Sequence, residues 1–591
     1  MRMLWDPLFE RLSDVAGAPP DQIKMIAALV LAFPLAAIFV RLPANRPNLA
    51  HIFSLIVTTF FLWPFLGLGW GYLELIFSCV VTYVLVATLK GSNMPWVVFF
   101  FVMGHLTITH VRRAIWAVPV TEIEISGSHM VLVMKLSTFA WNVHDGRRKT
   151  EELDNMQLAT RLSSLPNPLA FFGYCFYFPT VLVGPSFDYA SYDALIKHTL
   201  YTTPPPNAKS KISGRTPVGR RRVALLHFAI GIFFLAIFSL LGARGSFERV
   251  LTPTWYTWGK AQQFGFIQFC AFVARTKYYA VWSMSEGACI QSGLGFNGYD
   301  PKTGRTLWNR VRNINILAIE TSESFKVLLD SWNCRTNVWL RECVYKRLAK
   351  KGQKPGSFQS MATFVTSAFW HGVAPGYYLA FITCGLYSYL GRMFRNMVRP
   401  YFLPASSPGA ANSLPRWPYP NLAKRAYDLV GWACVQTGVA YAVVPFFVLE
   451  LKPSVLTWAR VYFYGHVSIF AAVAFFKFGG SRWLRKGLAP KAPRVKPLSP
   501  ADAPSVSVQP PSPLAETYER FGEDESAATS GVATPSNFVS EADEADDANI
   551  EWVAHDLQNK DQKDFSKMSD EILSGFDTPR RPGTPTQRKT Q

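Results

Sequence analysis

The sequence predicts an all-α polytopic membrane protein, and three observations support this fold class. First, 49% of the 591 residues are hydrophobic although the C-terminal fifth is visibly polar, so the apolar residues are concentrated upstream. Second, they form runs of roughly 17 to 23 residues with few charges, the length needed to cross a hydrocarbon core about 30 Å thick. Third, Lys and Arg flank these runs, as they do beside the cytoplasmic ends of membrane helices.

The runs predict about ten or eleven transmembrane helices, because in lipid a helix satisfies its own backbone polar groups. In chain order they are about 24–41, 52–68, 72–89, 95–111, 167–184, 223–242, 263–282, 314–330, 360–389, 428–450 and 457–477. The ninth is long enough to contain two elements.

The composition changes sharply after about residue 478. The segment "LAPKAPRVKPLSPADAPSVSVQPPSP" is rich in Pro, Ser and Ala, and "SEADEADDANIEW" is strongly acidic. Such a chain buries too little apolar area to offset its conformational entropy. We therefore expect a membrane domain at 1–480 and a disordered tail at 481–591.

The formal charge of +20 does not indicate a nucleic-acid partner, because the basic residues lie beside the apolar runs rather than on one soluble face. The eight cysteines are scattered and have no metal-ligand spacing. We therefore expect no nucleic acid, no metal site and no disulfide framework.

The apolar stretch "TSAFWHGVAPGYYLAF" contains one titratable side chain, His371. Gly372, Pro375 and Gly376 interrupt the helix just after it. Irregular backbone at membrane depth is tolerated only where it is buried in protein or lines a cavity. We therefore expect His371 beside an internal chamber, although a lone intramembrane histidine also serves as a hydrogen bond between helices.

A second polar element is "SWNCRTNVWLRECVY", in which Asn333 follows Trp332 at the end of an apolar run. A histidine and an amide together suit proton abstraction and the stabilisation of developing charge. Asn337 would share a helical face with Asn333 and is the rival amide.

A third element is "ARTKYYAVWSMSEGACIQSGLGFNG". On a helix Tyr278, Trp282 and Glu286 would form one stripe, and Lys277 adds a cation in an apolar context. An interfacial aromatic belt with a snorkelling lysine is the alternative interpretation. The GxGxxG string at 293–298 lacks the strand of a dinucleotide-binding unit, so we discard that interpretation.

A fourth element, "MVLVMKLSTFAWNVHDG" at 130–146, is too short to span a membrane and is divided by Lys135. We expect a re-entrant or in-plane amphipathic helix that ends at Asp145 and Gly146.

Together these four elements resemble the membrane-bound O-acyltransferase family, and specifically its lysophospholipid acyltransferase branch. "WHGVAPGYYLAF" is similar to the W-H-G-x-x-x-G-Y-Y-x-x-x-F signature of that branch. The other three elements are similar to its W-N-x-x-T-x-x-W-L-R block, its R-x-K-Y-Y-x-x-W-x-x-x-E-G segment and its Met-Val...Lys-Leu...Asp-Gly element. The resemblance implies helices around an intramembrane reaction chamber.

The resemblance also implies a reaction. His371 would act as the general base on the free hydroxyl of a lysophospholipid, and Asn333 would help to place the reactants or the base. Acyl-CoA would be a co-substrate, with no other cofactor. The remaining candidates for substrate contact are Trp370, Lys277, Tyr278, Tyr279, Trp282, Glu286, Asn337, Tyr377 and Tyr378.

The basic loop with Lys346, Arg347, Lys350, Lys351 and Lys354 could meet the CoA phosphates, or could be an ordinary cytoplasmic loop. The family implies an endoplasmic reticulum membrane, and the basic run at 482–496 indicates a cytosolic tail. No feature of the sequence indicates an oligomeric state.

Two alternatives remain. One is a relative of the same fold that acylates another lipid or a protein. The other is a proton-coupled transporter, which would need more intramembrane carboxylates and repeated halves than the sequence offers.

Overall fold

Helices make up almost all of the regular structure, which confirms the all-α class. The computed structural model describes residues 3, 5–119, 122–202, 212–213, 216–300, 303–349, 355–402 and 422–487, all in one compact unit. Within these residues the strands are a single antiparallel pair, β1 (Ile212–Ser213) and β2 (Thr216–Pro217), in which Ile212 is opposite Pro217.

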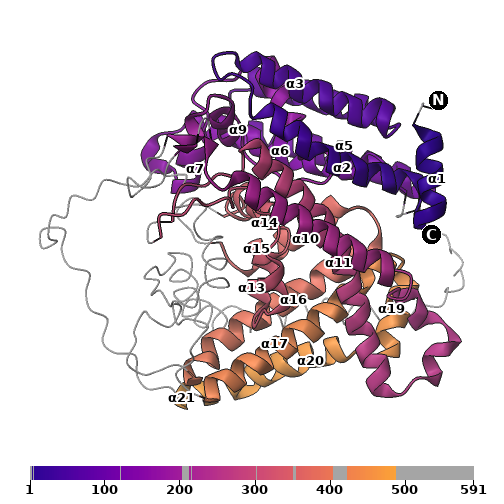
Figure 1. Cartoon of the computed structure of the whole chain (residues 1–591). Helices are drawn as coiled ribbons and strands as arrows, with labels where there is room; N and C mark the ends of the chain where they lie inside the picture. The colour runs from indigo at the N-terminus through magenta and orange to yellow at the C-terminus, as the bar shows by residue number, and fades with distance from the viewer. Residues whose placement is uncertain are drawn as a thin grey trace, which may run out of the picture. The chain divides into compact units, whose positions relative to one another are not determined.

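Five helices form the N-terminal part of the fold, at the top of Figure 1. Proline occupies one of the first two positions in α1, α2, α3 and α5, where its fixed φ suits the helix and its missing N–H is no loss. The five helices are α1 (Asp6–Ala16), α2 (Pro20–Phe39), α3 (Pro47–Phe60), α4 (Gly69–Thr88) and α5 (Met94–Ile115).

The sixth helix, α6 (Ser126–Gly146), packs against α4 and α5 and is buried on nearly all sides. Its Lys135 is fully buried, and the ammonium donates to the carbonyls of Tyr174 at 2.7 Å and Cys175 at 3.3 Å. The helix ends at Gly146, as predicted, but protein covers both faces and the one cation is bound internally, so the expected amphipathic character is wrong. The re-entrant or in-plane placement stays a prediction.

Two of the apolar runs before residue 350 do not become single long helices. The run at 167–184 contains α8 (Pro168–Cys175) followed by irregular, buried backbone, and Thr58 donates to the carbonyl of Phe176 at 2.7 Å. The run at 314–330 forms α12 (Ile316–Glu320) and α13 (Phe325–Ser331). Protein rather than lipid covers the first run, and neither hydropathy nor length distinguishes the two environments.

The middle of the chain is built around a helix of 33 residues, α11 (Lys260–Ser292). It pairs closely with α10 (Arg220–Leu241) and also contacts α2 and the later helix α17 (Leu422–Ala442), so it joins the N-terminal and C-terminal helices. The shorter helices in this part of the chain are α7 (Asn155–Thr160), α9 (Tyr189–Ile196) and α14 (Cys334–Leu340).

The C-terminal helices lie in the lower part of Figure 1. The run at 360–389 is divided, as predicted, into α15 (Ser357–His371) and α16 (Pro375–Met397). They are followed by α17, α18 (Val444–Val448), α19 (Leu451–Arg460), α20 (Tyr464–Phe475) and α21 (Ser481–Gly487). A side chain on Gly376 would collide with the backbone of Pro445 and Leu449, so glycine allows α16 to start directly against α18.

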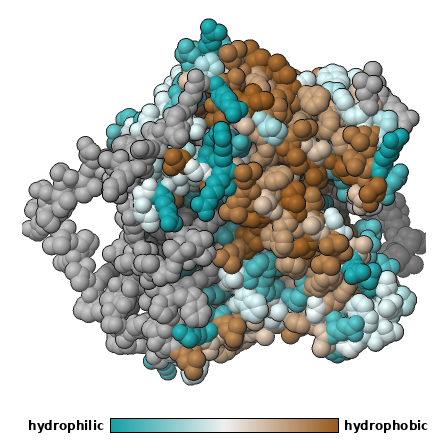
Figure 2. All heavy atoms as spheres, viewed as in Figure 1, coloured by the Kyte–Doolittle hydropathy of each residue, from teal (hydrophilic) through white to brown (hydrophobic). Residues whose placement is uncertain are grey.

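Seven helical segments are long and apolar enough to cross a membrane within the described residues. They are Pro20–Phe39, Pro47–Phe65, Gly69–Thr88, Met94–Ile115, Arg220–Leu241, Leu422–Val448 and Tyr464–Lys486. Figure 2 shows a broad apolar zone over the middle of the visible face, with hydrophilic residues towards its margins. The predicted tail lies outside the described residues from 488 onwards.

Candidate active site

The imidazole of His371 lies at the end of α15, where the helix stops. Gly372 has φ +144°, a conformation that side chains rarely allow, and Pro375 begins α16. The break therefore leaves His371 as the last helical residue. Its ring lies 5.1 Å from Phe381, 5.0 Å from Phe446 and 5.7 Å from Tyr377, measured between ring centroids.

The His371 ring has aromatic contacts but no hydrogen bond among the residues that the structure describes. It is half-buried. The neighbouring Trp370 is buried, and its indole N–H donates to the carbonyl of Met130 on α6 at 3.0 Å. The position of the imidazole is thus set by its neighbours, while its ring nitrogens stay free to take a proton.

The amide of Asn333 lies at the N-terminus of α14 with φ +46°, a left-handed conformation that asparagine tolerates better than most residues. The side chain is half-buried and makes no hydrogen bond within the described residues. The preceding residue, Trp332, anchors the segment, because its ring lies 5.4 Å from Tyr278 and 5.2 Å from Trp282.

The rival amide, Asn337, is already engaged. Its Nδ2 donates to the carbonyl of Trp332 at 3.0 Å and to that of Leu329. These bonds satisfy carbonyls at the end of α13 that have no helical partner. Of the two amides, Asn333 is therefore the one available to a substrate.

The stripe on α11 divides into two groups. Tyr278 and Trp282 surround Trp332 beside Asn333. Glu286 is buried, and its carboxylate accepts from the backbone N–H of Asn313 at 3.1 Å. The Asn313 carbonyl in turn accepts from the N–H of Cys334 at 2.8 Å, so Glu286 supports the turn that carries Asn333.

Tyr279 belongs to a separate group of polar contacts with Glu320 and Arg275. Its hydroxyl donates to Glu320 at 2.6 Å, and Arg275 forms two hydrogen bonds with the same carboxylate at 3.0 and 2.8 Å. Tyr279 is fully buried. Its contacts fix α12 against α11.

The remaining candidates, Lys277, Tyr377 and Tyr378, are at least partly exposed. Lys277 has no hydrogen bond or ion pair among the described residues, and the charge of Arg113 acts on both Lys277 and Tyr377. Tyr377 is also within electrostatic range of Tyr278.

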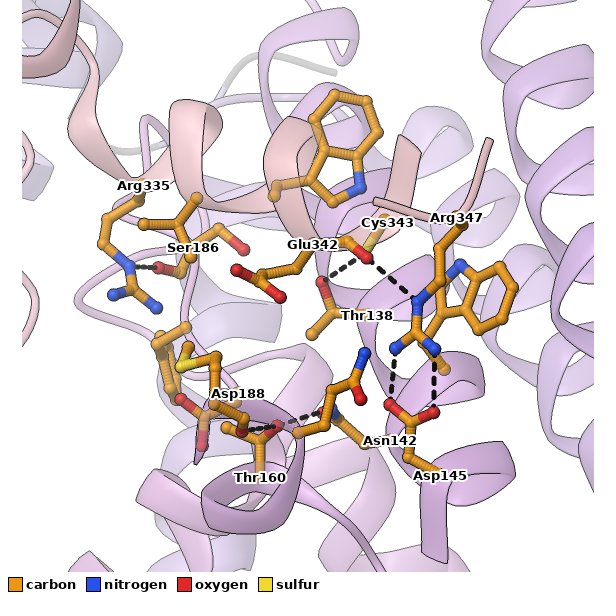
Figure 3. Close-up of a pocket in the computed structure, with 16 residues that line it drawn as sticks. Thr138, Asn142, Asp145, Thr160, Ser186, Asp188, Arg335, Glu342, Cys343 and Arg347 are labelled. Atoms are coloured by element: carbon orange, nitrogen blue, oxygen red, sulfur yellow. Dashed lines mark hydrogen bonds and ion pairs between the residues drawn. The ribbon is translucent and has the colours of Figure 1, made fainter. Parts of the chain in front are cut away.

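A partly open polar pocket lies beside Trp339, and its empty volume of ≈ 480 Å³ includes open solvent (Figure 3). Trp339 lines it, and the ring of Trp339 lies 5.8 Å from that of Trp370, the neighbour of His371. The polar lining includes Thr138, Asn142, Asp145, Asp188, Arg335, Glu342 and Arg347.

Ion pairs neutralise much of this pocket. Arg347 donates to both oxygens of Asp145, at 2.9 and 2.5 Å (Figure 3). Burial alone would raise the pKa of the Asp145 carboxyl, but the His144 ring nitrogen 3.5 Å away and the hydrogen bonds and charge of Arg347 outweigh burial and hold this pKa below its usual range. Arg335 donates to the carbonyl of Ser186 at 2.7 Å.

Two polar atoms of the pocket lining are left without a partner in the described part of the chain. They are Oδ1 of Asn142, an acceptor, and Nε1 of Trp141, a donor, and both residues are buried. Sequence reasoning did not select these two residues, although both lie within the element at 130–146 that it had marked.

The basic loop is only partly described. Lys346 pairs with Asp154 at 2.7 Å and with Glu342 at 2.9 Å, and Arg347 pairs with Asp145. Lys350, Lys351 and Lys354 lie outside the described residues. Lys346 and Arg347 are thus neutralised by carboxylates of the same chain, of which Asp145 is buried and Asp154 is exposed.

The eight cysteines are free, and no group of three or more His, Cys, Asp or Glu side chains that could bind a metal occurs among the described residues.

The sequence is similar to known proteins over most of its length. The sequence model of the membrane-bound O-acyltransferase family matches residues 113–413. The lysophospholipid acyltransferase of Schizosaccharomyces pombe is 37% identical over 476 residues, 80% of this chain and 90% of that protein. That of Saccharomyces cerevisiae is 37% identical over 80% of this chain and 77% of its own. Membrane-bound glycerophospholipid O-acyltransferase 1 of Homo sapiens is 30% identical over 77% of this chain and 89% of its own length.

Proposed function

The chain belongs to the membrane-bound O-acyltransferase family, and we propose that it transfers a fatty acyl group to the free hydroxyl of a lysophospholipid to give a diacyl phospholipid. It is a multi-pass membrane enzyme. The names of its relatives favour this acceptor over a sterol or a protein. The observation that supports the proposal for the site is the break after His371, which leaves an imidazole at the end of α15 without a hydrogen bond among the described residues.

In the proposed mechanism a ring nitrogen of His371 takes the proton of the lysophospholipid hydroxyl. The oxygen attacks the thioester carbonyl, the C–S bond breaks, and the departing thiolate takes the proton back from the imidazolium. Asn333 donates its amide N–H to the oxygen on which negative charge develops. A positioned base contributes about 10² to 10⁴ in rate, and holding two amphiphiles together must supply much of the rest.

The aromatic surroundings of His371 suit this reaction. Phe381, Phe446 and Trp370 exclude water from one side of the ring, which protects the thioester from hydrolysis. The acyl chains of both reactants lie in the bilayer, so a base at membrane depth meets them without drawing them into water.

For the donor we propose acyl-CoA, bound with part of its CoA moiety in the pocket of Figure 3. The unpaired acceptor on Asn142 and the unpaired donor on Trp141 complement the N–H and C=O of an amide such as those in the pantetheine arm. Trp339 lies between this pocket and Trp370, so a thioester that passes it would approach His371.

For location we propose the endoplasmic reticulum membrane with the pocket and the tail on the cytosolic side. Arg147 and Arg148 follow the pocket residue Asp145 closely in sequence, and Arg161 follows the pocket residue Thr160, as the positive-inside rule expects of a cytosolic end. The basic run at 482–496 begins in α21, at the C-terminal end of the last membrane segment, Tyr464–Lys486.

The proposal is tested in microsomes supplied with labelled oleoyl-CoA and a panel of lysophospholipids that differ in headgroup. Wild type should form diacyl phospholipid, and His371→Ala should lower the rate about 10²- to 10⁴-fold at equal protein level. Equal product from both proteins would remove His371 from the mechanism. Wild-type protein that acylates none of the panel would overturn the proposed acceptor.

A further inference from the structure

The last turn of α15 has a hydrogen bond that comes from another helix. Carbonyls in the final turn of a helix have no partner within the helix. Gly372 N–H satisfies that of Ala368 at 3.2 Å. The carbonyl of Trp370 instead lies 3.1 Å from Nε2 of His110, a buried residue of α5 that is 260 positions earlier in the chain.

The ring of His110 also lies against the break itself. A Cβ placed on Gly372 would be 3.6 Å from Cγ of His110 and 3.0 Å from Cε2 of Tyr377. His110 therefore contacts both the residue before His371 and the residue after it. Glycine at 372 provides the room for this contact.

Trp370 is consequently held at two points. Its carbonyl accepts from His110 on α5, and its indole N–H donates to the carbonyl of Met130 on α6. His371 is the next residue, and its own ring has only aromatic contacts. The two bonds to Trp370 are thus the polar contacts that fix where the imidazole points.

The helix that carries His110 is itself held rigidly. Thr109 lies 3.1 Å from Nδ1 of His129 on α6, and Ser78 on α4 contacts His105 at 2.6 Å and His129 at 3.4 Å. The charged and titratable groups that act on His110 are Glu124, Arg113, His129 and His371. None of them bonds to its Nε2, which is directed at Trp370.

We propose that His110 is a positioning residue for acyl transfer, which sets the orientation of the His371 imidazole by donating a hydrogen bond to the Trp370 carbonyl. This inference rests on the proposed role of His371 as the base. His110 touches neither reactant in this account. It acts through the Trp370 carbonyl, which belongs to the backbone directly before His371.

Three substitutions separate the hydrogen bond from simple packing. His110→Phe keeps the ring volume but removes the donor, His110→Gln keeps an N–H donor, and His110→Ala removes both. A displacement of about 1 Å can cost 10²-fold in rate. We expect kcat to fall about 10- to 100-fold in the Phe and Ala variants and to recover to within about 3-fold of wild type in the Gln variant, while KM for oleoyl-CoA stays within about 2-fold.

The matched control is His51, a buried histidine of α3 that bonds to the hydroxyl of Tyr192 at 2.9 Å, outside the site. His51→Phe should lower the melting temperature in detergent and leave kcat per folded enzyme unchanged. If His110→Ala does not fold, the Phe and Gln pair still decides, and His110→Asn can replace the Gln variant because it also keeps an N–H donor.

A Phe variant as active as the Gln variant would show that packing rather than the bond matters, and would overturn the inference. Wild-type kcat in all three variants would do the same. These outcomes are distinct from failure of the proposed function, which appears as full activity of His371→Ala in the same assay.

Discussion

The surroundings of His371 and the pocket of Figure 3 are linked by the contact between Trp370 and Trp339, but their polar groups are buried in different ways. Around His371 the contacts are aromatic rings, and the nearby hydrogen bonds involve the carbonyl and the indole N–H of Trp370 rather than the imidazole. In the pocket, side-chain cations are matched by carboxylates, as in Arg347 with Asp145.

The difference indicates a division of labour. A base must keep a ring nitrogen free, so its position is controlled through neighbours that carry no charge. A pocket that binds a polar part of a substrate can contain ion pairs, because these pairs hold its side chains in place. The unpaired atoms of Asn142 and Trp141 then remain available to hydrogen-bond the substrate.

The sharpest test of this division compares the two amides. Asn333→Ala should lower the transfer rate by about 10² to 10³, the usual cost of losing one donor to a developing oxyanion, with little change in melting temperature. Asn337→Ala should lower the melting temperature and change the transfer rate little, because the Asn337 amide donates to two backbone carbonyls at the end of α13. The measurements are kcat and thermal unfolding of both purified variants. A larger rate loss in Asn337→Ala than in Asn333→Ala would exchange their assigned roles.

A second test disturbs the apolar side at its break. Gly372→Ala should lower kcat about 10-fold and should also lower the equilibrium constant for folding about 10-fold. The reason is that φ +144° strains any side chain and the new Cβ would lie 3.0 Å from Tyr377. Gly391→Ala is the control, since it lies inside α16 and its Cβ would make only an ordinary 3.9 Å contact with Phe325. Equal behaviour of the two variants in a combined activity and melting assay would contradict the strain argument.

The smallest effect is expected on the ion-paired side. The pKa of Asp145 is lowered in the folded protein, so its contribution to stability is present above its usual value near pH 4 and is lost as the pH falls through the lowered pKa. The melting temperature of wild type should exceed that of Asp145→Asn at pH 7, and the gap should narrow between pH 5 and pH 3. A gap that stays constant over this range would show that the carboxylate charge contributes nothing.

The sequence was sufficient for the fold class and for the break after His371, because Gly372 and Pro375 disrupt a helix wherever they occur. It could not choose between Asn333 and Asn337, since the choice depends on carbonyls at the end of a neighbouring helix. It also could not find His110, although an intramembrane histidine is itself a signal. The partner of His110 is 260 residues away, and only the folded chain shows that contact.

The apolar run at 167–184 is a second case in which the sequence was not sufficient to predict the structure. Its composition suits lipid, yet it contains irregular backbone buried in protein, which becomes possible because side chains such as Thr58 satisfy its carbonyls. Hydropathy reports that a segment avoids water, not whether its neighbours are lipid or protein.

The ammonium group of Lys135 also has a consequence for biogenesis. The ammonium donates to the carbonyls of Tyr174 and Cys175, which are synthesised after α6. A nascent α6 that enters the bilayer alone would therefore carry an unpaired charge, at a cost of about 2.5 to 3.5 kcal/mol. Release from the insertion machinery should therefore wait until the ribosome has delivered residues up to about 180.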